Sequence, residues 1–180
     1  MNPTADDIVR DHLTTWQRRI ETTSASLVLP QTGSAQAALA PVLHQLVTVY
    51  DLSSGLVADL RQTADSPLAA TSAGRAYLGQ LAAALAHSNR AATHLSTTVT
   101  GLADAQRLAP RPGTAAPIES QLAVTLGHAA ALRSLHRALE AVTRPLAGPE
   151  QSLGLSSTPV AGQHSRVADR GGIQPTRRRS

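Results

Sequence analysis

The sequence contains no cysteine and no phenylalanine, and only three of its 180 residues are tryptophan or tyrosine. Without cysteine the chain has no disulfide bond, no thiolate zinc site and no cysteine nucleophile. Because large side chains are rare, a hydrophobic core must be built mainly from leucine, valine and alanine. Small side chains let helices approach one another closely, so the composition favours packed helices in one domain of ordinary size.

Lysine is also absent, since all sixteen basic residues are arginine. This bias, together with abundant alanine, leucine and threonine, is typical of GC-rich actinobacterial genomes. The sequence pI of about 10.9 therefore does not by itself indicate an anionic partner. No apolar run approaches the roughly 20 residues of a membrane span, and the acidic start lacks the pattern of a secretory signal. We predict a cytoplasmic protein without a membrane partner.

Four segments carry apolar side chains at alternating steps of three and four residues, the spacing of one helix face. The first spans residues 4–27, with Thr4 as N-cap and acidic residues after it. Its stripe is Val9, Leu13, Trp16, Ile20, Thr23 and Leu27. The third begins after Pro67 and continues to Leu108, long enough for a rod on the order of 50 Å. Its stripe is Gly74, Leu78, Leu81, Leu85, Ser88, Ala92, Leu95, Val99 and Leu102.

The second and fourth segments involve proline. The second spans residues 34–65, and Pro41 predicts that its helix either begins near Ala40 or bends there. Its stripe matches a coiled-coil heptad and consists of Leu39, Leu43, Leu46, Tyr50, Ser53, Val57 and Leu60. The fourth begins at Pro117 and should stop at Gly148. Its stripe is Ile118, Leu122, Ala129, Leu132, Leu135, Leu139, Val142 and Leu146.

These segments predict an all-α fold, an elongated antiparallel four-helix up-down bundle over residues 1–147. Residues 148–180 lack apolar periodicity and are predicted to be a disordered basic tail. The bundle region has 11 arginines and 10 acidic residues, whereas the tail has five and two. Most of the positive charge is therefore expected in the tail.

Motifs for catalysis and metal binding are absent from the sequence. There is no Glu-x-x-His motif, no pair of histidines three or four residues apart and no phosphate-binding glycine loop. We therefore predict no enzyme activity, no metal and no cofactor.

Several polar and aromatic residues still leave alternatives open. Ser53 and Ser88 occupy stripe positions, and an enzyme or small-ligand carrier with a pocket at the level of Ser53, Ser88 and His136 stays open as an alternative. A buried serine more often bonds the carbonyl four residues back, and Glu140 is expected to make a surface contact with His136. His87 and His94 share one face and are expected at the solvent edge. The large residues Trp16, Tyr50 and Tyr77 are predicted to fill the core.

Weak charge on the bundle suggests the function. Only 21 of its 147 residues are charged, so Ala/Leu/Thr-rich faces of the third or fourth helix are available to other helices. We predict a non-enzymatic interaction or scaffold module that forms a homo-oligomer or binds a helical protein. The alternative is an accessory nucleic-acid-binding protein whose arginines contact phosphates, namely Arg166, Arg170, Arg177, Arg178 and Arg179.

Overall fold

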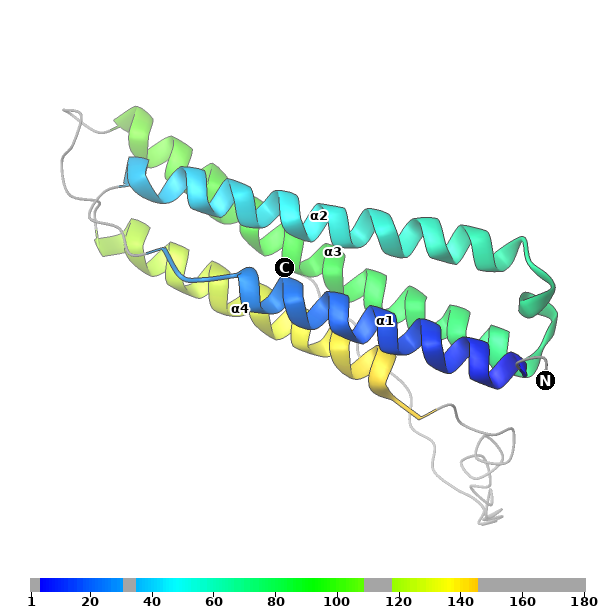
Figure 1. Ribbon diagram of the computed structural model, residues 1–180. Coiled ribbons are helices and arrows are strands. Elements are labelled where there is room, and N and C mark those ends of the chain that lie inside the picture. The colour runs from blue at the N-terminus through cyan, green and yellow to red at the C-terminus, as the bar shows by residue number, and fades with distance from the viewer. Residues whose placement is uncertain (1–3, 31–34, 109–117, 146–180) are drawn as a thin grey trace, which may run out of the picture. The chain divides into compact units, whose positions relative to one another are not determined.

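The computed structural model describes residues 4–30, 35–108 and 118–145. Within these ranges the chain forms four α-helices and one short 3₁₀ helix, and no strand (Figure 1). The elements are α1 (Ala5–Ser26), α2 (Ala35–Ala64), η1 (Pro67–Ala70), α3 (Ser72–Leu108) and α4 (Ile118–Thr143). The predicted all-α class with four helices is confirmed. The predicted tail, residues 148–180, lies outside the described residues.

The four α-helices run side by side in up-down order, with α3 packed against both α2 and α4, and α1 packed mainly on α4 (Figure 1). The predicted antiparallel bundle is therefore confirmed. Helix α3 has 37 residues and is about 55 Å long at the usual helical rise, whereas α1 has 22. Because α1 is short, it covers only part of the bundle's length.

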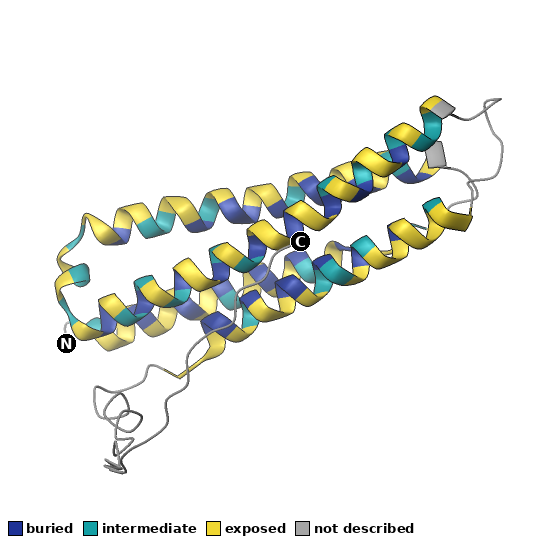
Figure 2. Cartoon of the chain, turned by 180° about the vertical axis from the view of Figure 1, so that it is seen from behind, coloured by how far each residue is buried: buried dark blue, intermediate teal, exposed yellow. Residues whose placement is uncertain are grey.

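Helix α1 agrees closely with its prediction. Thr4 is the N-cap: its hydroxyl accepts a hydrogen bond from the Asp7 N–H, while the Thr4 N–H donates to the Asp7 carboxylate. This reciprocal capping box gives the backbone N–H groups of both Thr4 and Asp7 a hydrogen-bond acceptor. All six predicted stripe residues are buried, and the outward faces of the helices are exposed (Figure 2).

The start of α3 differs from its prediction. Pro67 begins the 3₁₀ helix η1, and α3 starts five residues later, where the Thr71 hydroxyl accepts a hydrogen bond from the Gly74 N–H at 2.9 Å. Gly74 lies so close to η1 that an added Cβ would be 1.9 Å from the Leu68 carbonyl oxygen. A glycine is thus required where η1 folds back on α3. The predicted α3 stripe is buried or half-buried throughout.

The predicted stripe of α2 is wrong at three positions. Leu43, Tyr50 and Val57 are exposed, and the buried face lies one residue earlier. That inner face consists of Ala38, Val42, Gln45, Leu46, Val49, Leu52, Ser53, Leu56 and Thr63. The physical reason is that apolar residues cover so wide an arc of α2 that two heptad stripes fit the sequence, and packing against α3 selects one.

Of the two alternatives at Pro41, a helix start near Ala40 is wrong, because α2 begins at Ala35 and passes through Pro41; a bend there stays a prediction. Pro41 is exposed, so its ring lies away from the packed face of the helix. Helix α2 also continues without a break through Ser53, Ser54 and Gly55.

The predicted stripe of α4 is also wrong in the first half of the helix. Ile118, Leu122 and Ala129 are exposed, contrary to prediction, and the helix ends at Thr143 rather than near Gly148. Leu146 lies outside the described residues. The buried face consists of Val124, His128, Ala131, Ser134, Leu135, Ala138, Ala141 and Val142. Alanine and serine on this face permit close packing on α3, as the composition predicts.

Candidate functional site

The predicted nucleic-acid site, comprising Arg166, Arg170, Arg177, Arg178 and Arg179, lies outside the described residues. The second candidate, the Ser53, Ser88 and His136 level, is not brought together as a pocket. Ser53 and Ser88 are buried and their hydroxyls have no hydrogen-bond partner, so the expected bonds to the preceding turn are not formed. His136 is on the exposed side of α4.

The expected contact between His136 and Glu140 is confirmed. The His136 Nε2 atom is 3.4 Å from a Glu140 carboxylate oxygen, and both side chains are largely exposed. Both residues line a depression between α1 and α4, but neither Ser53 nor Ser88 does. An exposed pair of this kind contributes little to stability.

His87 and His94 differ in burial. His94 is exposed, as expected for the solvent edge, whereas His87 is half-buried between α3 and α4, where its Nδ1 atom has no partner. Burial lowers the pKa of His87, and the positive charges of Arg90 and Arg137 lower it further. The neutral imidazole is therefore favoured at this position.

A polar cluster that the sequence analysis did not identify lies where α1, α2 and α3 meet. The Asp59 Oδ2 atom on α2 accepts hydrogen bonds from the Trp16 indole N–H on α1 and, at 2.6 Å, from the Tyr77 hydroxyl on α3. The Asp59 Oδ1 atom accepts a longer bond, 3.3 Å, from the Thr63 hydroxyl. One carboxylate thus joins three helices through neutral donors.

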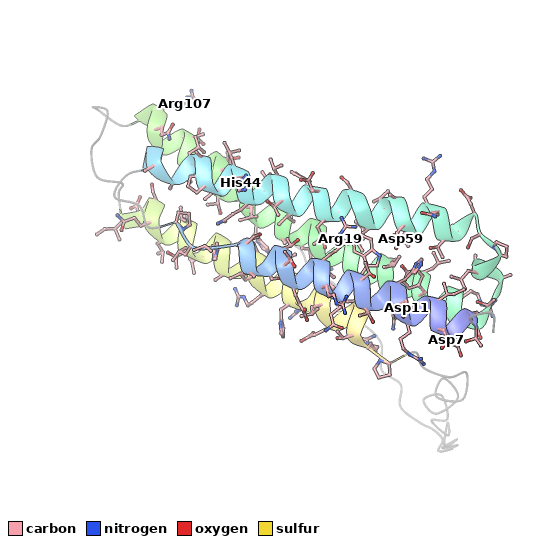
Figure 3. The ribbon with its side chains drawn as sticks, in the orientation of Figure 1. Asp7, Asp11, Arg19, His44, Asp59 and Arg107 are labelled. Carbon is pink, nitrogen blue, oxygen red and sulfur yellow. The ribbon has the colours of Figure 1, made fainter. Side chains whose placement is uncertain are left out.

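His12 and Arg19 complete this cluster on α1. The His12 Nδ1 atom is 3.3 Å from the Tyr77 hydroxyl oxygen, and the two rings meet edge to face. The Arg19 guanidinium lies over the Trp16 ring, 4.5 Å from its centre. Figure 3 shows Arg19 and Asp59 on neighbouring helices. Burial, followed by the Asp59 hydrogen bond, raises the pKa of Tyr77 well above its ordinary value, so Tyr77 remains a donor.

The sequence held one signal for this cluster. Asp59 and Thr63 continue the inner face of α2 at the same spacing as Leu52 and Leu56. The buried stripe therefore places a carboxylate on the face of α2 that packs against the other helices. The predicted stripe, which ran through Val57, placed Asp59 outside it. Trp16 and Tyr77 are buried as predicted, but their polar atoms serve Asp59.

A second feature is an apolar stripe on the outward side of α2. We name it the outer α2 stripe, and it consists of Leu43, Val47, Tyr50 and Val57, which are between 41% and 54% exposed. A shorter exposed set lies on α4 and consists of Ile118, Leu122 and Leu126. No large apolar side chain of α3 is exposed in the part of the chain that the structure describes.

Among the described ranges, no helix combines the length and apolar character of a membrane span. The same ranges contain no cluster of three or more side chains suited to hold a metal ion. Comparison with models of known protein families, with curated proteins and with solved structures finds no significant match. Function must therefore be inferred from the geometry of this chain.

Proposed function

We propose that the chain is a non-enzymatic helical interaction module that self-associates through the outer α2 stripe. The observation that carries the proposal is the outward position of four large apolar side chains on one helix. Together with Ser54 they follow alternating steps of four and three residues, the spacing at which helices pair in coiled coils. Contact with an apolar surface would remove these side chains from water and so stabilise an assembly.

A second copy of the chain is the partner that this face fits. Between Leu43 and Val57, Asp51 is the only arginine, aspartate or glutamate in the sequence, so the face has little charge to select a partner of opposite sign. An antiparallel pair of α2 helices would place the same stripe on both sides of a two-fold axis, as a closed dimer requires. This proposal moves the interface from the third or fourth helix, where the sequence analysis placed it, to α2.

Sedimentation velocity of the full chain, followed from micromolar to millimolar concentration, tests the proposal. We expect reversible dimerisation, and we expect Val47→Glu to weaken it by about tenfold or more because a carboxylate would be desolvated at the interface. Leu126→Glu is the matched control, since it introduces the same charge at a similarly exposed leucine on α4. Circular dichroism should show that both variants retain their helices.

A chain that remains monomeric throughout would overturn self-association. Equal weakening by Val47→Glu and Leu126→Glu would remove α2 as the specific interface. If the wild type were monomeric but a helical partner were retained by it and lost with Val47→Glu, the stripe would serve a different protein. The nucleic-acid alternative and the cytoplasmic location remain predictions of the sequence, because no described residue bears on them.

A further inference from the structure

The Asp59 carboxylate has hydrogen-bonding capacity that the bundle does not use. Its Oδ2 atom accepts two hydrogen bonds, from Trp16 and Tyr77, but its Oδ1 atom accepts only the 3.3 Å bond from Thr63. A carboxylate oxygen can accept about two such bonds. Oδ1 therefore has room for a further donor.

No cation of the described residues forms an ion pair with Asp59. Arg19, on the neighbouring helix, stacks over the Trp16 ring instead. A half-buried carboxylate bonded only by neutral groups is stabilised less than one paired with a positive charge. A cation brought to Oδ1 would supply the missing charge.

Asp59 is one of the residues that line a solvent-open cavity of about 430 Å³ between α1, α2 and η1. This volume falls within the range of roughly 300–1,000 Å³ that is typical of small-molecule sites. The cavity has apolar walls, formed by Ala5, Ile8, Pro67 and Leu68. It therefore combines a carboxylate with a surface suited to an aliphatic body.

The histidine at this cavity adds a second acceptor. Because the Tyr77 hydroxyl donates its proton to Asp59, it must accept from His12, which assigns the hydrogen of the neutral imidazole to Nδ1. The Nε2 atom of His12 is then an acceptor. The hydroxyls of Ser66 and Thr71, which also line the cavity, donate to backbone carbonyls at 2.8 and 2.7 Å. Gln62 is the lining residue that brings further N–H donors. The other polar atoms of the lining are mainly acceptors, which fit a ligand that is rich in donors.

We propose that this cavity binds a small organic ammonium ion, with the ammonium group on Asp59 Oδ1 and its apolar body against Ile8, Pro67 and Leu68. An ammonium group has three N–H donors, which match the acceptors Asp59 Oδ1 and His12 Nε2. Its positive charge matches the negative charge of the Asp59 carboxylate, which no cation pairs. A neutral alcohol has the apolar body without the charge, and a carboxylate ligand has a charge that Asp59 repels. The cavity shares no residue with the outer α2 stripe, so the two proposals fail independently.

Titration of the full chain, followed by amide chemical shifts in NMR spectra, tests this site with three ligands of equal chain length. We expect n-hexylammonium to bind saturably, with shifts centred on Ile8, Asp59 and Leu68. Hexan-1-ol and hexanoate should bind at least about tenfold more weakly. Asp59→Asn should weaken hexylammonium binding by about tenfold or more, whereas Asp51→Asn should leave it unchanged. Asp51 is the matched control because it is an exposed aspartate of the same helix outside the cavity.

A second variant keeps the test decisive if Asp59→Asn fails to fold. Ala5→Phe would fill the cavity from the first turn of α1 and leave the carboxylate in place, and it should also weaken hexylammonium binding. The proposal is overturned if hexylammonium causes no saturable shifts at the cavity. It is equally overturned if hexan-1-ol binds as tightly, or if a folded Asp59→Asn or Ala5→Phe variant binds like the wild type.

Discussion

The inner and outer faces of α2 are both apolar and both follow heptad spacing, yet only the inner face is buried. Leu56 is fully buried against the bundle, while its neighbour Val57 is half exposed. The difference between these adjacent residues arises from their position around the helix axis rather than from their chemistry. It shows that periodicity identifies an apolar helix face but does not choose between two such faces. The contact with α3 makes that choice.

The largest expected effect on stability comes from shortening one side chain on each face of α2. Leu56→Ala should lower the free energy of unfolding by about 2–5 kcal/mol, because it leaves a cavity in a packed core. Val57→Ala, which changes the outer face, should change it by about 0.5 kcal/mol or less when measured at concentrations where the chain is monomeric. Urea unfolding followed by circular dichroism measures both. Similar losses for the two variants would mean that the assigned faces of α2 are wrong.

Helix α3 allows the same comparison with glycine. Gly74→Ala should destabilise the fold by about 1–3 kcal/mol, since its Cβ would overlap the Leu68 carbonyl and displace η1. Gly101 has open space around it, so Gly101→Ala should instead stabilise α3 by about 0.5–1 kcal/mol. The melting temperatures of the two variants should move in opposite directions, and a shift of both in one direction would contradict the described packing at η1.

Removal of the Tyr77 hydroxyl tests the part of the inner face of α2 where Asp59 lies. Tyr77→Phe keeps the buried ring but removes the donor to Asp59 and the acceptor for His12. We expect a loss of about 1–2 kcal/mol, because a partly buried carboxylate loses a short hydrogen bond. Tyr50→Phe is the control, since Tyr50 is exposed on the outer face. Urea unfolding that shows no difference between the two variants would remove the cluster as a structural element.

The smallest effect concerns pH. Because the folded-state pKa of His87 is lowered, chiefly by burial and then by Arg90 and Arg137, the unfolded chain binds its proton more readily. This contribution to stability is present above the ordinary histidine pKa of about 6.5 and is lost as the pH falls through that value toward the folded pKa. Arg90→Gln should reduce the loss, whereas Arg90→Lys should retain it. Urea midpoints at neutral and mildly acidic pH measure the difference, and identical profiles for both variants would contradict the contribution assigned to Arg90.

Contrasting α1 with α2 explains which predictions from the sequence were correct. On α1 the charged residues Asp11, Arg18 and Glu21 lie between the stripe positions, so only one face is apolar and every predicted stripe residue is buried. Helix α2 has few charges to mark its solvent side. With that marker missing, the predicted stripe included Tyr50, which is exposed, and left out Asp59, which is half-buried and bonded to Trp16 and Tyr77.

The sequence by itself determined that the chain is helical, where α1 begins and α3 ends, and that four helices pack in an up-down bundle. These properties depend on local interactions, such as the Thr4 capping box, and on the simple periodicity of apolar residues. Only the tertiary structure decided which stripe of α2 is buried. It also decided the close approach of η1 that requires glycine at position 74, and the hydrogen bonds of Asp59 with Trp16 and Tyr77. Those contacts join residues from 6 to 43 positions apart, and neither propensity nor spacing within one helix specifies the rotation at which neighbouring helices meet.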